Sequence, residues 1–232
     1  MATEECHQTS LSSSRDIECV RLVQFKRVRH KIIGFHINMS EAARDKAELR
    51  SKMRSYLATV SKKHIESSSA SITRHIVDAN RLLSNVHTLA IYASIQNEVS
   101  LSALHQLLPG KKLLYPLCHP GHQLSFHHVT YENQLAISSM QIPEPQPDLH
   151  PEFEIERIDM ILCPGLAFGT DGSRLGRGHG YYDRALDEFP GIKLGIALDQ
   201  QITPTVPHTS HDATMDYLVS ESSISATKPL QE

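Results

Sequence analysis

The segment Arg174-Leu-Gly-Arg-Gly-His-Gly-Tyr-Tyr-Asp-Arg184 places flexible backbone directly beside charged side chains. Its glycines, Gly176, Gly178 and Gly180, can adopt positive φ and carry no Cβ to block an approaching ligand. Successive backbone N–H groups in such a loop can converge on an anion, and arginine side chains suit the geometry of phosphate or carboxylate. The segment therefore predicts an anion-binding loop rather than an ordinary surface turn.

The residues after the third glycine extend this prediction. Tyr181, Tyr182 and Asp183 are expected to open a helix, and the N-terminus of a helix favours an anion. Asp183 would repel a phosphate directly, so its presence predicts a hard cation such as Mg²⁺ between the two groups.

Two common phosphate-binding motifs do not fit this loop. The P-loop pattern G-x-x-x-x-G-K-[ST] is absent. A dinucleotide-binding fingerprint would need a third glycine where Tyr181 stands, and these glycines lie about a dozen residues beyond the preceding strand instead of in its first turn. A nicotinamide-dependent dehydrogenase using the same loop stays open as an alternative.

Hydrophobic periodicity predicts the helices and strands on either side of this segment. A helix is expected to begin after Ser40, with helical spacing at Leu49, Met53, Tyr56, Leu57 and Val60. Lys46, Arg50 and Arg54 follow the same spacing on another face of that helix. Further helices are expected at 72–83, 99–108 and 181–189. Strands are expected at 88–94, 112–118, 124–129, 158–164, 193–198 and 216–221, and an irregular surface loop at 142–154, which holds four prolines.

Alternating strands and helices predict an α/β fold. We expect three α/β/α layers around a mostly parallel, Rossmann-like central sheet. The chain has 232 residues, of which 40% are hydrophobic and 21% charged, so it can bury a substantial core.

Composition excludes some classes of protein and indicates the cellular compartment. A net charge of −3 gives no general attraction to nucleic acid or to an acidic membrane, and no apolar run reaches the length of about 20 residues that a membrane span needs. Cys6, Cys19, Cys118 and Cys163 form no C-x-x-C pair, which is typical of free thiols in a reducing compartment. We expect a monomer in the cytoplasm, with mitochondria the less favoured location.

Residues 1–38 differ from the rest of the chain, which we expect to be one domain over 39–232. The first part is rich in serine, and residues 21–31 are basic. We favour a disordered extension, or translated sequence ahead of a true start at Met39. A mitochondrial presequence is opposed by four early acidic residues, and a basic nucleic-acid-binding arm is a further alternative.

A family resemblance now adds to these predictions. The segment "PGLAFGTDGSRLGRGHGYYDR", residues 164–184, resembles the signature of 5-formyltetrahydrofolate cyclo-ligase, also called methenyltetrahydrofolate synthetase. Four further segments resemble motifs of that family in the same order: Lys46–Arg50, Tyr92–Val99, Glu144-Pro145 and His211–Asp216. The resemblance covers most of the chain, from Lys46 to Glu221.

The resemblance implies a reaction. Members of the family use ATP and Mg²⁺ to convert 5-formyltetrahydrofolate into 5,10-methenyltetrahydrofolate, releasing ADP and phosphate. The formyl oxygen is phosphorylated, N10 attacks the activated carbon, and phosphate leaves. Such chemistry requires a basic, preorganised site more than a strong nucleophile.

The resemblance also implies roles for individual residues. The implied ATP-binding residues are Lys46, Arg50, Arg174, Leu175, Gly176, Arg177, Gly178, His179, Gly180, Tyr181 and Tyr182. The implied folate-binding residues are Glu98, at the end of a strand, and Arg177, Gly178, His179, Gly180 and Tyr181. Arg177, His179 and Tyr181 are the catalytic candidates, and Asp183 and Asp212 the candidate Mg²⁺ ligands. From local sequence alone, a solvated basic face is the favoured interpretation of Lys46 and Arg50, and Glu98 could equally be an ordinary loop acid.

One departure from the family bears on ATP binding. His179 stands where members often carry Gly or Lys, and a nearby phosphate favours the protonated imidazole. ATP affinity is therefore expected to fall as the pH rises. A third function also stays open, a non-catalytic relative that binds folate, or RNA through residues 21–31. Cys163 is expected in the core and not as a nucleophile.

Overall fold

The computed structural model describes residues 41–209 and 212–227. The predictions for the extension at 1–38, for a start at Met39, for a cap at Ser40 and for His211 lie outside the described residues. From Glu41 onward the chain forms one compact unit.

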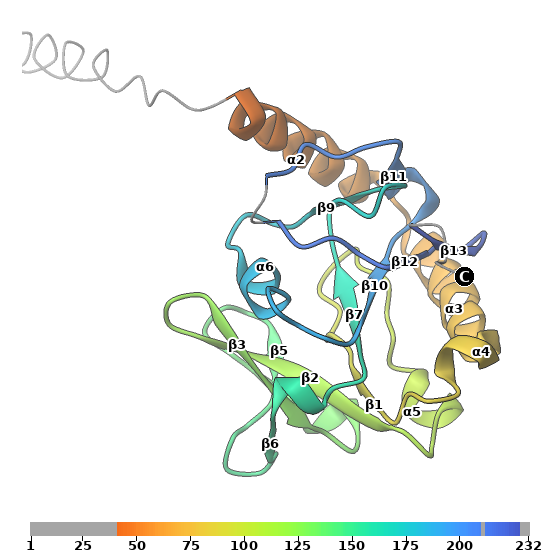
Figure 1. Cartoon of the computed structure of the whole chain (residues 1–232), viewed down its shortest axis with the longest axis vertical. Coiled ribbons are helices and arrows are strands. Elements are labelled where there is room, and N and C mark those ends of the chain that lie inside the picture. Colours follow the sequence, from red (N-terminus) through yellow and green to blue (C-terminus); the bar gives the residue numbers. More distant parts are fainter. Residues whose placement is uncertain (1–40, 210–211, 228–232) are drawn as a thin grey trace, which may run out of the picture. The chain divides into compact units, whose positions relative to one another are not determined.

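A central sheet of eight strands organises the fold, in the order β13-β12-β10-β7-β1-β2-β3-β6 (Figure 1). The strands are β1 (Thr88–Ala90), β2 (Lys112–His119), β3 (Gln123–His128), β6 (Glu152–Phe153), β7 (Met160–Pro164), β10 (Ile192–Ile196), β12 (Tyr217–Val219) and β13 (Ile224–Ala226). The pairs between β12, β10, β7, β1 and β2 are parallel, and β13, β3 and β6 add antiparallel edges. The predicted mostly parallel α/β sheet is confirmed.

Alternation along the strands builds a core on each face of the sheet. Leu89, Met160 and Leu162 belong to one hydrophobic cluster, which also contains helix residues. Their neighbours Ala90 and Ile161 belong to a second cluster. Successive side chains of a strand point to opposite faces, so both faces are covered. Figure 1 shows α3 (Lys62–Asp78) and α6 (Tyr181–Ala185) on opposite sides of the sheet, which gives the three expected layers.

The first predicted helix is confirmed as α2 (Glu41–Thr59), which buries Met53 and Leu57. The second is longer than expected, because α3 begins after Ser61, whose hydroxyl accepts a hydrogen bond from the backbone N–H of His64. It is also interrupted at Ala79, where ψ is 57°, and α4 (Asn80–Leu83) follows.

Two other helices are much shorter than predicted. Only α5 (Leu104–Leu107) is helical within the predicted 99–108 segment. The backbone N–H of Ser100 donates to the hydroxyl of Ser69, and that of Ser102 to the hydroxyl of Ser100, so side chains replace the helical hydrogen bonds. The helix predicted at 181–189 ends at Ala185.

The prediction of an irregular surface loop at 142–154 was partly wrong. The short strand β5 (Pro143–Glu144) pairs with β4 (Ala136–Ile137), and β6 extends the main sheet. Glu144 and His150 are buried. Proline is tolerated in edge strands that make few ladder bonds, which is why the proline count misled. The segment 216–221 is also not the last strand, since β13 follows β12.

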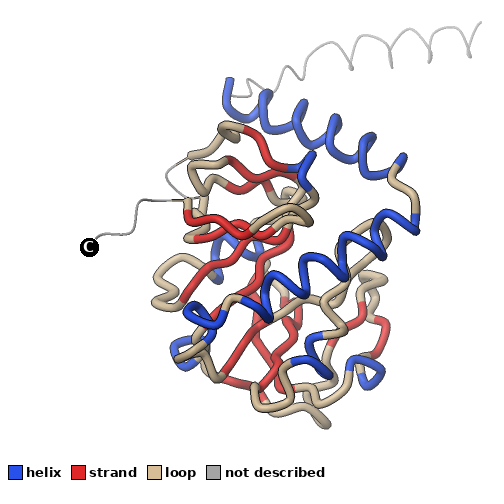
Figure 2. The backbone as a smooth tube through the Cα atoms, turned by 90° about the vertical axis from the view of Figure 1, so that its right-hand side faces the viewer, coloured by secondary structure: helices blue, strands red, loops and turns tan. Residues whose placement is uncertain are grey.

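A second sheet of three strands lies beside α2. Its strands are β8 (Ala167–Gly169), β9 (Arg174–Leu175) and β11 (Ile202–Thr203), in the order β11-β8-β9. Figure 2 shows α2 running across the same end of the molecule as these short strands. The glycine loop connects β9 to α6 (Tyr181–Ala185). No described helix has both the length and the apolar character to cross a membrane.

Candidate active site

The predicted site residues gather near the carboxyl ends of the parallel strands, the edge where open α/β sheets commonly bind ligands. The polypeptide enters the second sheet after β7 ends at Pro164, and returns through the glycine loop at 176–180. Glu98 lies in the loop that follows β1, not at the end of that strand as expected, because β1 ends at Ala90. Residues 91–95 belong to no helix or strand, and a turn follows at Gln96 and Asn97.

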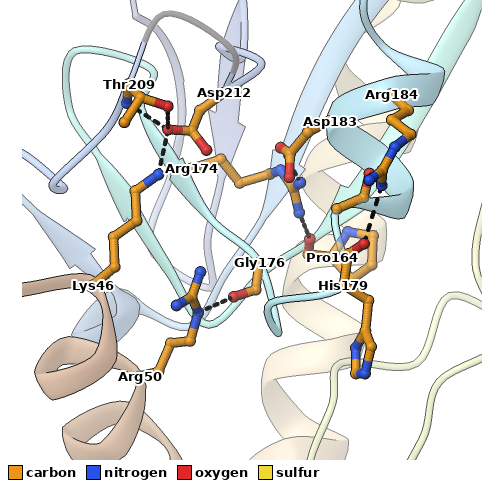
Figure 3. Close-up of polar contacts among 11 residues, drawn as sticks. Lys46, Arg50, Pro164, Arg174, Gly176, His179, Asp183, Arg184, Thr209 and Asp212 are labelled. Atoms are coloured by element: carbon orange, nitrogen blue, oxygen red, sulfur yellow. Dashed lines mark hydrogen bonds and ion pairs between the residues drawn. The ribbon is translucent and has the colours of Figure 1, made fainter. Parts of the chain in front are cut away.

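The basic face of α2 contacts the glycine loop directly. Arg50 Nε donates to the carbonyl of Gly176 at 3.0 Å, and Arg54 Nη2 donates to the carbonyl of Arg177 at 3.0 Å. Lys46, one turn earlier, forms an ion pair with Asp212. Figure 3 shows Lys46 and Arg50 extending from the same helix toward these two partners. The alternative of a merely solvated basic face is therefore wrong for this helix.

Positive backbone φ angles confirm the need for glycine at two positions of the loop. Gly178 has φ 113° and Gly180 has φ 72°, in the region that side chains disfavour. Gly180 also forms the N-cap of α6. Arg184 holds this end of the loop, since its Nη1 donates to the carbonyls of His179 and Gly180 at 3.1 and 3.0 Å. The loop conformation is thus fixed from both sides.

Arg174 lies beneath the loop and not on its surface. Its side chain is buried and donates to Asp183 Oδ1 at 2.7 Å and to the carbonyl of Pro164 at 3.0 Å. It also stacks over the ring of Tyr182, with 5.5 Å between the guanidinium carbon and the ring centre. Leu175 is buried in the core, so only its backbone is available to a ligand. Arg174 therefore supports the loop and orients Asp183.

Asp212 is held in a polar cluster of its own. Its carboxylate accepts hydrogen bonds from Lys46 and from both the backbone N–H and the hydroxyl of Thr209 (Figure 3). Burial alone would raise the pKa of Asp212, but these hydrogen bonds outweigh it and keep that pKa below its usual value. Asp212 is therefore a carboxylate across the ordinary pH range.

Asp183 and Asp212 chemically fit a Mg²⁺ ion that is shared with a phosphate. Both supply the hard oxygen ligands that Mg²⁺ prefers, and Mg²⁺ commonly takes one or two carboxylates, with water and substrate phosphates completing its shell. Within residues 41–209 and 212–227 no group of three or more metal-binding side chains occurs. The pair suits a metal that arrives with its nucleotide.

Arg177 and Glu98 join the glycine loop to the loop after β1. Arg177 Nη2 and Nε lie 2.6 and 3.1 Å from Glu98 Oε1. The other oxygen of Glu98 accepts the backbone N–H of Ile95 at 3.2 Å. A residue expected to act on phosphate and one expected to contact folate are thus in direct contact.

Three rings cluster at the exposed side of the loop. His179 and Tyr181 approach His122, with ring centres 6.0 and 5.2 Å apart respectively, and the hydroxyl of Tyr181 lies 3.8 Å from the sulfur of Met140. Sequence analysis missed His122 and Met140. His122 has φ 60° and follows Gly121 in the turn between β2 and β3, so the Pro-Gly dipeptide before it was the available signal.

Comparison with known proteins decides the family. The family model described as the 5-formyltetrahydrofolate cyclo-ligase family matches residues 42–221. The chain belongs to this family. The match spans α2, the glycine loop and Asp212, and it removes the dehydrogenase alternative.

Relatives of the cyclo-ligase family agree with this assignment. The 5-formyltetrahydrofolate cyclo-ligase of Escherichia coli K12 is 30% identical over 145 residues, which cover 60% of this chain and 80% of that protein. A probable member from Caenorhabditis elegans is 29% identical, covering 79% of this chain and 96% of the relative. The solution structure of Aquifex aeolicus 5,10-methenyltetrahydrofolate synthetase is 29% identical with a TM-score of 0.71, covering 81% of this chain and 95% of that one.

Proposed function

We propose that the chain converts 5-formyltetrahydrofolate into 5,10-methenyltetrahydrofolate at the expense of ATP, with Mg²⁺ as the metal. Family membership supports the folate chemistry. The main support for an ATP site comes from Arg50 and Arg54, which donate hydrogen bonds to the backbone of the glycine loop, and from Lys46 on the same helix. Fixed cations on a helix and backbone N–H groups in a glycine loop together form a preorganised phosphate site.

The chemistry explains why such a site is needed. The formyl oxygen attacks the γ-phosphorus of ATP, and ADP leaves. N10 then attacks the formyl carbon and loses its proton, while the carbon–oxygen bond breaks and the oxygen departs with phosphate. An amide oxygen is otherwise a poor leaving group. Most of the catalytic effect must come from positioning the two substrates and from neutralising phosphate charge.

The ion pairs of the site prepare its charged groups for this task. Asp212 and Glu98 orient Lys46 and Arg177 before the substrates bind. When ATP binds, both cations turn to its phosphates. Asp183 and Asp212 would hold Mg²⁺, and the bound ion would supply positive charge against the phosphoryl group that is transferred.

Mixing the protein with 5-formyltetrahydrofolate, ATP and Mg²⁺ should produce the near-ultraviolet absorbance of the methenyl product. Chelation of Mg²⁺ or the Asp183→Asn substitution should remove the signal. Labelling the formyl oxygen with ¹⁸O should place the label in the released phosphate. Folate binding without product would identify a non-catalytic relative, and product without label in phosphate would refute the phosphorylated intermediate.

A further inference from the structure

A short chain of hydrogen bonds joins two histidines through a serine on one face of strands β2 and β3. Ser125 Oγ lies 2.6 Å from His119 Nε2 and 2.8 Å from His127 Nε2. Ser125 and His127 are two residues apart on β3, so their side chains share one face of the sheet. None of the three is among the residues assigned above to ATP, folate or Mg²⁺. The serine is a hydroxyl held between two imidazoles outside the candidate active site.

The hydrogen bonds fix the direction in which the serine proton points. His127 Nδ1 lies 2.9 Å from the carbonyl oxygen of His150, which can only accept, so this nitrogen carries the proton. In the neutral ring Nε2 then has a lone pair and accepts the hydroxyl proton of Ser125, and His119 Nε2 donates to Ser125 Oγ. A serine that donates to an imidazole, whose other nitrogen is held by an acceptor, has the arrangement that activates catalytic serines.

The serine is accessible, whereas the imidazole that accepts its proton is not. His127 is only 3% exposed. Ser125 and His119 line a cavity of about 660 Å³, large enough for a small organic molecule. The same cavity is lined by four carboxylates and one guanidinium, on Glu152, Glu156, Asp187, Glu188 and Arg184. This excess of negative charge disfavours anions, so the cavity suits neutral or cationic molecules.

We propose that Ser125 is a second reactive site of this protein, a nucleophile that is acylated by small neutral or cationic esters. Ser125 Oγ attacks the ester carbonyl, and its proton moves to His127 Nε2. The alcohol leaves with that proton, and the acyl group stays on Ser125. Water then attacks the acyl-serine and gives a proton to His127, which returns it to Ser125 as the acid leaves.

The surroundings of the serine set the scope of this reaction. His119 Nε2–H is a donor beside the reacting oxygen, close to where negative charge develops in the transition state. The carbonyl of His150 stabilises a protonated His127 less than the carboxylate of a Ser-His-Asp triad does. The reaction should therefore be slow and confined to esters with a good leaving group.

The test incubates the protein with p-nitrophenyl acetate, a small neutral ester with a good leaving group. Peptide mass spectrometry then follows the acetyl group on each serine. Acetylation of Ser125 should be at least about 100-fold faster than that of the exposed Ser139, since a positioned general base contributes about 10²- to 10⁴-fold. Ser125→Ala should lose this acetylation and keep its methenyl formation, which separates the two sites.

Two matched histidine variants identify the base. His127→Gln should slow the acetylation of Ser125 about 100-fold or more. His128→Gln changes the next residue of β3, whose side chain points to the other face of the sheet, and should leave the rate unchanged. No acetylation of Ser125 in wild type, or equal rates in the two histidine variants, would overturn the inference.

A further variant decides the case in which His127→Gln does not fold. Ser125→Cys keeps His127 and replaces the hydroxyl by a thiol, which iodoacetamide alkylates only as the thiolate. Beside a base, this thiol should titrate below the value of about 8.5 that is usual for a free cysteine, as the pH profile of its alkylation will report. A midpoint at or above that value would reject His127 as the base.

Discussion

Arg177 Nη2 lies 2.6 Å from Glu98 Oε1, and this contact connects the glycine loop to the segment after β1. The pair is partly exposed, with 40% of the arginine side chain and 14% of the glutamate side chain accessible. Exposed pairs contribute little to folding, so conformational stability alone does not explain this contact. Its position between the proposed phosphate side and the proposed folate side of the site fits a role in catalysis.

Replacing Arg177 should therefore affect catalysis far more than folding. For Arg177→Met we expect kcat/KM to fall about 100-fold or more, as when one charged group of a phosphoryl-transfer site is removed. The free energy of unfolding should change by at most about 1 kcal/mol. Steady-state kinetics and urea unfolding measure the two effects. Arg157→Met, which removes an exposed arginine 3.9 Å from Glu154, is the matched control and should change neither. A loss of stability that accounts for the lost activity would contradict this role.

Lys46 should act mainly on ATP. Lys46→Met removes the cation that pairs with Asp212, and we expect the KM for ATP to rise about 10- to 100-fold, as for other charge-assisted contacts. The KM for 5-formyltetrahydrofolate should change little. Lys52→Met, on the same helix but exposed, serves as the control and should behave like wild type. Equal effects of both substitutions would mean that general charge, and not position, matters.

Arg174 should matter mainly for stability. In Arg174→Met the carboxylate of Asp183 loses the partner at 2.7 Å that compensates it in a partly buried place. Breaking such a pair costs about 3 kcal/mol, which chemical denaturation can measure. The double variant Arg174→Met/Asp183→Asn should recover part of this loss, because it removes the uncompensated charge. Strictly additive losses in the two single variants would show that the pair is not coupled.

The sequence predicted those features that depend on local pattern. The period of Met53 and Leu57 placed α2 correctly, and the apolar run at 158–164 proved to be the central strand β7. The glycine loop was predicted because positive φ and close ligand approach demand glycine whatever the fold. For its contact with α2, the sequence predicted only that the basic residues share one face of that helix.

Features that depend on distant partners were missed. The helix predicted at 99–108 was too long, because the backbone N–H of Ser100 donates a hydrogen bond to the hydroxyl of Ser69 on another helix. The burial of Arg174 and its contact with Pro164 are visible only in the fold, while its part in ATP binding stays a prediction. Glu144 looked like a loop acid among prolines, and its burial depends on β5 folding back along β2.

Replacing Gly178 should lower stability and activity because of the backbone conformation at this position, and not because a side chain would be crowded. A Cβ at this position would lie 3.7 Å from Arg50, an ordinary contact, but φ 113° is unfavourable for any side chain. In Gly178→Ala the loop must change shape, at a cost of about 1–2 kcal/mol, and activity should fall steeply. Gly110→Ala is the control, since a Cβ there meets nothing within 4 Å. Thermal unfolding and the methenyl assay report both effects, and normal activity in Gly178→Ala would show that the loop conformation is not required.

Cys118 should be an unreactive thiol whose reactivity depends on Glu144. Burial, together with the hydrogen bond and the charge of Glu144, raises the pKa of Cys118 to about 12. Only the thiolate is alkylated, so near pH 8 iodoacetamide should modify Cys118 about a thousandfold or more slowly than a free cysteine, with the rate rising about tenfold per pH unit. Glu144→Gln removes the charge of this partner, so the pKa of Cys118 should fall and its alkylation should accelerate at fixed pH.

Peptide mass spectrometry follows the alkylation of Cys118 and of Cys163. Burial also raises the pKa of Cys163 to about 12, and this thiol should not respond to the substitution. Equal acceleration at both cysteines would indicate general loosening of the fold instead of a contact between Glu144 and Cys118.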